Sequence, residues 1–162
     1  MKKKKKGKIK KRPPTIQHQP KKISDSVIFP DCDSYYFYNM GRLMDDDKKV
    51  VVEIGGGNNL LCDAFMKGLI AGNKSGISFY RIDESMDEEE KRIGFIDNLK
   101  TFNVLASIDV IPLSHIVSVS NFNDRSIDII FINDNSPFSD TYALLSAWYP
   151  KLKDNGWLSG FL

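Results

Sequence analysis

An acidic residue and three successive glycines separate an apolar run from an amphipathic segment. The stretch reads Val50-Val51-Val52-Glu53-Ile54-Gly55-Gly56-Gly57-Asn58. Glycine permits a tight turn with positive φ and lets a ligand approach the backbone closely. A helix that begins after such a turn presents free N–H groups, which favour a phosphate or a carboxylate. The pattern therefore predicts a ligand-binding turn at the end of a buried strand.

The neighbours of this turn exclude two common nucleotide sites. A P-loop ends in Gly-Lys-Ser/Thr, where this chain has Asn58-Asn59-Leu60. A dinucleotide turn requires a third glycine at the position of Leu60. The carboxylate of Glu53 would repel a pyrophosphate and would attract an ammonium or sulfonium group. Glu53 is also a candidate structural carboxylate that caps the turn.

Apolar spacing predicts strands and helices in alternation from Lys49 onward. We expect strands at 49–54, 77–82, 106–111, 127–132 and 157–162, and helices at 58–71, 87–102, 114–122 and 140–149. A Lys-Asp-Asn-Gly turn is expected at 153–156. This order predicts an α/β fold, a Rossmann-like doubly wound parallel sheet of about five strands. Ligands of such sheets bind at the carboxyl ends of the strands.

Four segments, in order and spacing, resemble class I S-adenosylmethionine-dependent methyltransferases. Residues 53–57 resemble motif I of that family, and 79–83 resemble its second strand, which ends in an acidic residue. Residues 126–133 resemble the fourth strand, and 148–160 resemble the passage into the fifth. The resemblance covers roughly residues 49–162 and implies S-adenosylmethionine as the cofactor.

By this resemblance the cofactor-binding residues are Glu53, Gly55, Gly56, Gly57, Asn58, Asp83, Ser114 and Asn133. The glycines would wrap the methionine portion, Glu53 would act near its ammonium, and Asp83 would accept hydrogen bonds from the ribose hydroxyls. Ser114 falls near the position that contacts adenine in the family, and it is equally a candidate helix N-cap.

The acceptor side departs from the family pattern. Asn133 replaces an Asp that binds magnesium in metal-dependent members, so no metal site is predicted. Asp134 is the nearby candidate for a general base. The family's C-terminal β-hairpin has no counterpart in the sequence, which leaves an open sheet edge as a candidate homo-oligomer surface. The resemblance implies methyl transfer to a small-molecule or protein acceptor. The alternative is a degenerate methyltransferase-like domain that binds a ligand or protein partner without catalysis.

Charge divides the chain into a basic arm and an acidic body. Residues 1–24 contain eleven Lys or Arg, three Pro and no acidic residue, whereas the remainder has twelve basic and twenty-one acidic residues. Like charge and few apolar side chains predict a disordered arm. Its candidate roles are contact with nucleic acid or another polyanion, an address signal, or a solubilising tail.

Residues 25–48 form a lead-in segment, and 49–162 form the predicted domain. The aromatic stretch 35–40 is expected to pack on that domain, with a substrate-facing lid as the alternative. Cys32 and Cys62 lack the spacing of a metal site and are expected to be reduced thiols. No apolar run approaches membrane-spanning length, and we expect a cytoplasmic protein. Trp148 and Trp157 are expected in the core.

Overall fold

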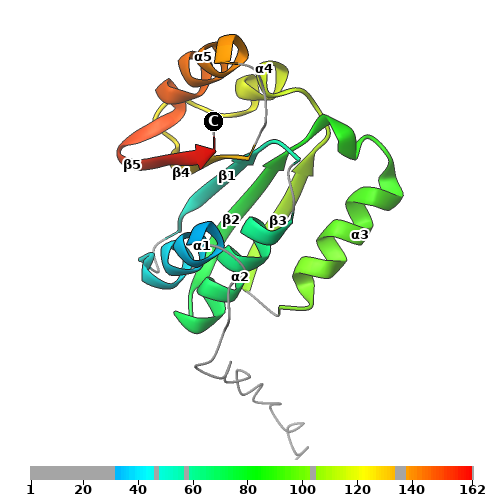
Figure 1. Cartoon of the computed structure of the whole chain (residues 1–162), viewed down its shortest axis with the longest axis vertical. Coiled ribbons are helices and arrows are strands. Elements are labelled where there is room, and N and C mark those ends of the chain that lie inside the picture. Colours follow the sequence, from blue (N-terminus) through cyan, green and yellow to red (C-terminus); the bar gives the residue numbers. More distant parts are fainter. Residues whose placement is uncertain (1–31, 46–47, 57–58, 103–104, 134–137, 162) are drawn as a thin grey trace, which may run out of the picture.

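The computed structural model describes residues 32–45, 48–56, 59–102, 105–133 and 138–161 of the 162-residue chain. Within them, a parallel sheet has helices on both faces (Figure 1). Its strands are β1 (Val50–Ile54), β2 (Ser75–Ile82), β3 (Leu105–Ile111), β4 (Ile127–Asn133) and β5 (Leu152–Phe161). Their order in the sheet is β3-β2-β1-β4-β5. The predicted fold class, a Rossmann-like doubly wound α/β sheet, is confirmed.

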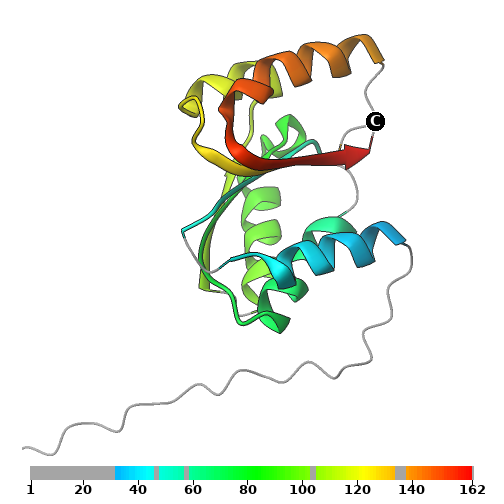
Figure 2. The same ribbon diagram turned by 90° about the vertical axis from the view of Figure 1, so that its left-hand side faces the viewer.

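The helices form a layer on each side of the sheet. They are α1 (Cys32–Leu43), α2 (Leu60–Ala71), α3 (Glu89–Lys100), α4 (His115–Ser118) and α5 (Phe138–Trp148), with 3-10 turns η1 (Glu84–Met86), η2 (Val119–Asn121) and η3 (Tyr149–Lys151). Helices α1, α2 and α3 cover one face, and α4 and α5 cover the other (Figure 2). The chain adds β2 and β3 on one side of β1 and then returns to place β4 on the other side, so the switch point lies between β1 and β4. Because the strands are parallel, the carboxyl ends of β1, β2 and β4 lie together at one end of the sheet.

The central strand β1 consists mainly of β-branched residues, which favour a buried parallel strand. Val51 and Val52 point to opposite faces, and both are fully buried. Val51 is paired with Phe79 of β2 on one side and with Ile129 of β4 on the other. Strand β1 therefore has a partner on each side, and the residue after it emerges at the centre of the sheet edge.

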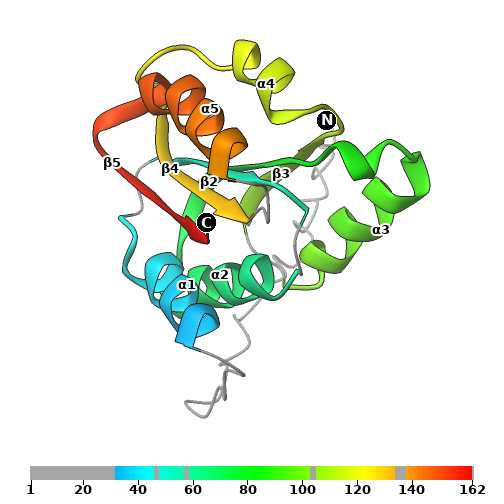
Figure 3. The same cartoon turned by 45° about the horizontal axis from the view of Figure 1, so that its top comes forward.

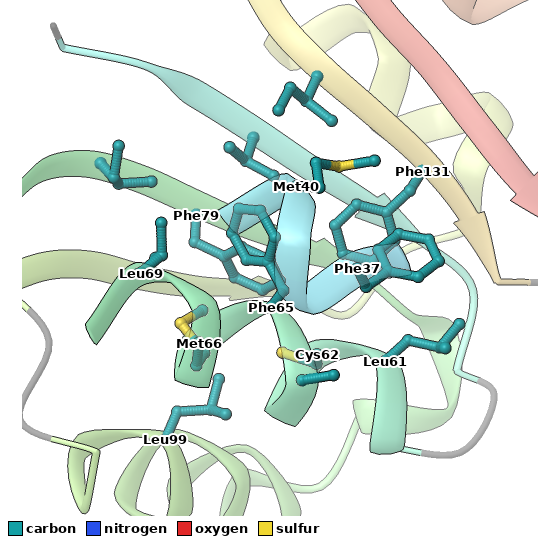
Figure 4. Packing of buried hydrophobic residues seen from close by; sticks show 14 of the residues in the cluster. Phe37, Met40, Leu61, Cys62, Phe65, Met66, Leu69, Phe79, Leu99 and Phe131 are labelled. Atoms are coloured by element: carbon teal, nitrogen blue, oxygen red, sulfur yellow. The ribbon is translucent and has the colours of Figure 1, made fainter. Parts of the chain in front are cut away.

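Four phenylalanines form the centre of the core beneath α1 and α2 (Figure 4). Phe37 of α1 lies 5.0 Å from Phe131 of β4 between ring centroids, in an edge arrangement. Phe79 of β2 lies 6.0 Å from Phe131 and 6.1 Å from Phe65 of α2. Tilted and edge contacts at these separations are the favoured aromatic geometry. The cluster fixes α2, which begins at the glycine turn, against the sheet.

Helices α1 and α2 pack against each other through glycines. A Cβ on Gly41 would overlap the carbonyl oxygen of Phe65, and a Cβ on Gly68 would overlap that of Tyr38. Phe37 is 1% exposed beneath this contact, while Tyr36 faces outward at 50%. The prediction that the aromatic stretch packs on the domain is confirmed, because α1 is held against both α2 and the sheet.

The opposite face of the sheet has its own core. Trp148 of α5 is fully buried and lies 5.4 Å from the Phe122 ring. Trp157, also expected in the core, is 54% exposed, so that prediction is wrong. Trp157 belongs to β5, which is the edge strand of the described sheet and has a strand neighbour on one side only. Figure 3 shows β5 at this edge.

The predicted turn at 153–156 is also wrong. These residues belong to β5, whose register with β4 shifts between Ile127, opposite Leu152, and Ile129, opposite Trp157. The extra residues form an irregularity within the strand, as in a β-bulge, and the strand continues. The other predicted elements are present with boundaries shifted by a few residues. None of the described helices is long and apolar enough to cross a membrane.

The basic arm, 1–24, lies outside the described residues. Its proposed disorder and polyanion contacts stay predictions, as does the division of the chain at residues 24 and 48.

Candidate functional site

The glycine turn follows β1 at the carboxyl edge of the sheet. Gly55 has φ of 100°, in the region that side chains disfavour, and its N–H donates to the carbonyl of Ile82 at 2.8 Å. Gly56 passes over the end of β2, where an added Cβ would lie 2.6 Å from Asp83 Oδ2. Gly55 is therefore required for its conformation, and Gly56 for its close approach to the neighbouring strand.

Arg81 connects the elements that form this edge. Its side chain is 1% exposed. The guanidinium donates to Asp83 Oδ2 from Nε (3.2 Å) and Nη2 (3.0 Å), to Asn59 Oδ1 from Nη1 (2.8 Å), and to the Gly56 carbonyl from Nη2 (2.8 Å). Its central carbon lies 4.5 Å from the centre of the Phe95 ring, in a cation–π contact. One side chain thus holds the end of β2, the glycine turn, the start of α2 and a face of α3 in fixed positions.

Glu53 lies opposite Arg81 in the register of β1 and β2 and is completely buried. Its Oε2 is 3.7 Å from Arg81 Nη1. Its Oε1 accepts a hydrogen bond from Asn133 Nδ2 at 3.0 Å, which ties β1 to β4. Oε2 has no hydrogen-bond partner within the described part of the chain. The carboxylate is thus ion-paired on one side and hydrogen-bonded on the other.

Burial is the main cause of a raised pKa at Glu53. Removal from water disfavours the charged form and raises the pKa of this carboxyl from 4.5 to about 7. The charge of Arg81 and the hydrogen bond from Asn133 act in the opposite direction, and the carboxylates of Asp83 and Asp63 add to the rise. Near neutral pH, Glu53 is therefore divided between its acid and its carboxylate form.

Asp83 is saturated with hydrogen bonds. It follows β2 directly and is 5% exposed. Its Oδ2 accepts the two bonds from Arg81, and its Oδ1 accepts from the backbone N–H of Ser85 (3.1 Å) and from the Ser85 hydroxyl (2.7 Å). Asp83 is therefore a fixed, buried part of the site and not an exposed loop residue.

The segment after β3 brings Ser114 to the same edge. Ser114 occupies the N-cap position of α4, but its side chain makes no capping hydrogen bond. The indole Nε1 of Trp148 donates to the His115 carbonyl at 3.1 Å, which anchors this segment to α5. The N-cap alternative is thus correct for position, while the hydroxyl of Ser114 is not used for capping.

A cavity of about 300 Å³ lies between these segments. Its lining comes from the ends of β1 and β2 and from the segment after β3: Ile54, Gly55, Gly56, Ile82, Asp83, Glu84, Ser85, Leu113, Ser114 and His115. Five of these lining residues are polar and three are apolar, and polar groups at fixed positions can orient a small ligand. The structure brings together Gly55, Gly56, Asp83 and Ser114, which all belong to the predicted set.

Glu53 and Asn133 do not line this cavity. They lie behind the glycine turn and contact each other. Gly57, Asn58 and the candidate base Asp134 lie outside the described residues, so their roles stay predictions. The role of Glu53 near a ligand ammonium also stays a prediction.

A second cavity, of about 210 Å³, lies at the opposite end of the strands, where β1 and β4 begin. Its lining includes Lys49 before β1, Asp128 near the start of β4, and Trp157 of β5. There, Asp128 Oδ2 accepts hydrogen bonds from the backbone N–H of Val50 and from Lys153 Nζ, each at 2.8 Å. This cavity is far from the glycine turn in the sheet and shares no residue with it.

The described residues offer neither a cluster of metal ligands nor a disulfide. No group of three or more His, Cys, Asp or Glu side chains there could hold a metal ion. Cys32 is exposed and Cys62 is buried, and neither forms a disulfide. Burial raises the pKa of the Cys62 thiol, which keeps it protonated and unreactive.

Sequence reasoning missed Arg81 and Ser85. A charged residue in an apolar strand must have a partner when it is buried, and Arg81 precedes Asp83 by two positions, on the same face. That spacing was a usable signal for the Arg81–Asp83 pair. The partner across the sheet, Glu53, depends on strand register, which the sequence pattern did not provide.

The strand order, the helices on both faces and a cavity at the carboxyl ends of the strands define a Rossmann-like α/β protein. No protein family and no curated protein matches the sequence. A Corynebacterium glutamicum protein of known crystal structure is similar in fold, with a TM-score of 0.57 and 16% sequence identity. The match covers 77% of this chain and 55% of that protein, so the chain spans about half of its length. At this identity the likeness establishes the fold alone.

Proposed function

We propose that this chain binds S-adenosylmethionine and transfers its methyl group to an acceptor. The observation that carries the proposal is the composition of the 300 Å³ cavity. Four residues that the sequence resemblance assigned to the cofactor line it together: Gly55, Gly56, Asp83 and Ser114. They come from three separate segments of the chain. A cavity at this edge fits the general position of ligands in parallel sheets.

The residues present fit an adenosyl ligand. Gly56 packs directly against the Asp83 carboxylate, and together with Gly55 it gives this side of the cavity a wall of backbone without side chains. Asp83 would accept from a ribose hydroxyl in exchange for one of its present hydrogen bonds, and Leu113 and Ser114 offer an apolar surface and a hydroxyl to a base. When bound, S-adenosylmethionine supplies an electrophilic methyl group on a sulfonium.

The chain's own contribution to transfer is orientation. Arg81 fixes Asp83 and the glycine turn relative to each other, so the ligand would meet a preformed surface. Holding two reactants in one geometry removes much of the entropic barrier of a bimolecular transfer. A general base such as Asp134 would be needed only for acceptors that lose a proton, and that role is a prediction from the sequence.

Calorimetric titration with S-adenosylmethionine tests binding. We expect a saturable heat for the natural chain and a loss of affinity of at least about tenfold in Asp83→Asn, which weakens the acceptor for ribose hydroxyls. Asp109→Asn is the matched control, because Asp109 is an exposed residue of the adjacent strand β3. Its affinity should equal that of the natural chain. Absence of heat, together with an unchanged melting temperature at millimolar ligand, would contradict the proposal.

A non-catalytic ligand-binding domain is the second candidate. The observation in its favour is that Glu53, Arg81 and Asn133 contact one another behind the glycine turn and do not line the cavity. Release of S-adenosylhomocysteine in the presence of pooled hydroxyl, amine and protein acceptors separates the two candidates. Tight binding without any such release favours the non-catalytic domain.

A further inference from the structure

Asp83 has no free acceptor position in this structure. A carboxylate has about four lone-pair sites. Two are used by Arg81, whose Nε and Nη2 donate to Oδ2 at 3.2 and 3.0 Å. The other two are used by Ser85, whose backbone N–H and hydroxyl donate to Oδ1 at 3.1 and 2.7 Å. A ligand hydroxyl can bind Asp83 only if one of these four bonds is released.

The bonds from Arg81 cannot be released easily. Arg81 is buried, and its guanidinium also holds Asn59 and the Gly56 carbonyl. Moving it would leave the buried carboxyl groups of Asp83 and Glu53 without their cation, which is costly. Oδ2 therefore stays with Arg81, and Oδ1 is the side of the carboxylate where exchange can occur.

On the Oδ1 side, the Ser85 hydroxyl is the group that can leave. The backbone N–H of Ser85 is fixed by η1, whose N-cap is Asp83. The hydroxyl needs only a rotation about χ1 to leave. Ser85 is an exposed residue and also lines a groove of about 390 Å³ toward Asn59, Phe95 and Asn98, so the rotated hydroxyl has space and polar neighbours.

We propose that the Ser85 hydroxyl competes with a ligand hydroxyl for Asp83 and thereby sets the affinity for the hydroxylated part of the ligand. Its hydroxyl occupies the Asp83 Oδ1 position that a ligand hydroxyl takes over. Binding of a nucleoside then replaces one O–H···O⁻ bond by another, and the Ser85 hydroxyl turns toward the groove. The inference rests on the proposed adenosyl site and adds a residue that competes with the ligand for it.

The test compares adenosine with 2′,3′-dideoxyadenosine, which lacks both ribose hydroxyls. Affinities are measured by NMR shift titration for the natural chain, Ser85→Ala and Ser85→Thr. Ser85→Ala vacates one acceptor position, so it should bind adenosine about three- to tenfold more tightly than the natural chain does, the range of one net hydrogen bond. Dideoxyadenosine should bind the two equally. Ser85→Thr retains the hydroxyl and should behave as the natural chain.

Two results overturn the role of Ser85 alone. One is weaker adenosine binding by Ser85→Ala, which makes the hydroxyl a ligand contact. The other is an equal gain for both nucleosides, which places the effect away from Asp83. Thermal melting of each variant shows whether it is folded. If no variant binds adenosine and the natural chain also gives no heat with S-adenosylmethionine, the proposed function itself fails, and the exchange role fails with it.

Discussion

Glu53 and Arg81 face each other across the register of β1 and β2, with Oε2 and Nη1 3.7 Å apart and both side chains buried. The contact is an ion pair without a hydrogen bond, since Oε2 has no donor among the described residues. Arg81 directs its N–H groups to Asp83, Asn59 and the glycine turn. The charge of Glu53 is therefore only partly compensated.

This relationship predicts a stability that falls as pH rises. The pKa of Glu53 is raised from 4.5 to about 7, so its favourable contribution is complete below pH 4.5 and is lost as pH passes 7. Urea unfolding of the natural chain and Glu53→Gln at pH 5 and pH 8 measures this loss. Relative to Glu53→Gln, the natural chain should lose about 2.5 kcal/mol of its unfolding free energy between the two pH values. Asp97→Asn, on the exposed face of α3, should follow the natural chain, and parallel profiles for all three proteins would contradict the prediction.

Arg81→Met should destabilise the fold strongly. The substitution leaves the buried carboxylates of Glu53 and Asp83 without their cation, which costs about 3–5 kcal/mol. Arg125→Met is the control, because the Arg125–Asp154 pair is 3.3 Å long and its side chains are 72% and 75% exposed. That loss should stay below about 1 kcal/mol. Urea denaturation at pH 7.5 compares the two, and equally small losses would show that Arg81 does not organise the site.

Gly56→Ala should damage the cavity. Its Cβ would lie 2.6 Å from Asp83 Oδ2, and Arg81 prevents the carboxylate from moving aside. We expect a loss of stability of about 1–3 kcal/mol and at least tenfold weaker binding of S-adenosylmethionine. Gly94→Ala is the matched control, since nothing lies within 4 Å of a Cβ at that position in α3. This variant should be more stable than the natural chain by roughly 0.5–1 kcal/mol and should keep its affinity for the ligand. Equal behaviour of the two alanines in calorimetry would refute the close-approach argument.

Asn133→Asp should make stability more dependent on pH. The amide of Asn133 donates to Glu53 Oε1 at 3.0 Å, and an aspartate has no donor to offer when ionised. Two facing carboxylates should cost about 1–3 kcal/mol at pH 8. At pH 5 the loss should be smaller, because a protonated carboxyl can donate to its neighbour. Asn98→Asp, at an exposed position of α3, should show no such difference. A loss that is the same at both pH values would exclude charge repulsion as its cause.

Much of the fold was predictable because its signals are local. The β-branched run of β1, the glycines after it and the acidic residue after β2 each appear within a few residues of sequence. Alternation of strands and helices then predicted the sheet, and the family resemblance grouped Gly55, Gly56, Asp83 and Ser114, which line one cavity at the carboxyl ends of the strands. Errors arose at β5, where the predicted turn is an irregularity within the strand, and at Trp157, whose exposure depends on its place at the sheet edge.

The sequence by itself determined which residue stands at the end of each strand: Gly55 after β1, Asp83 after β2 and Asn133 at the end of β4. Tertiary structure alone decided how those ends pair: Arg81 with Glu53 by strand register, and Asn133 with Glu53 across 80 positions of sequence. A residue's type limits what it can bind. Burial removes water as a partner, so the neighbours brought by the fold decide which side chains are already occupied and which remain for a ligand.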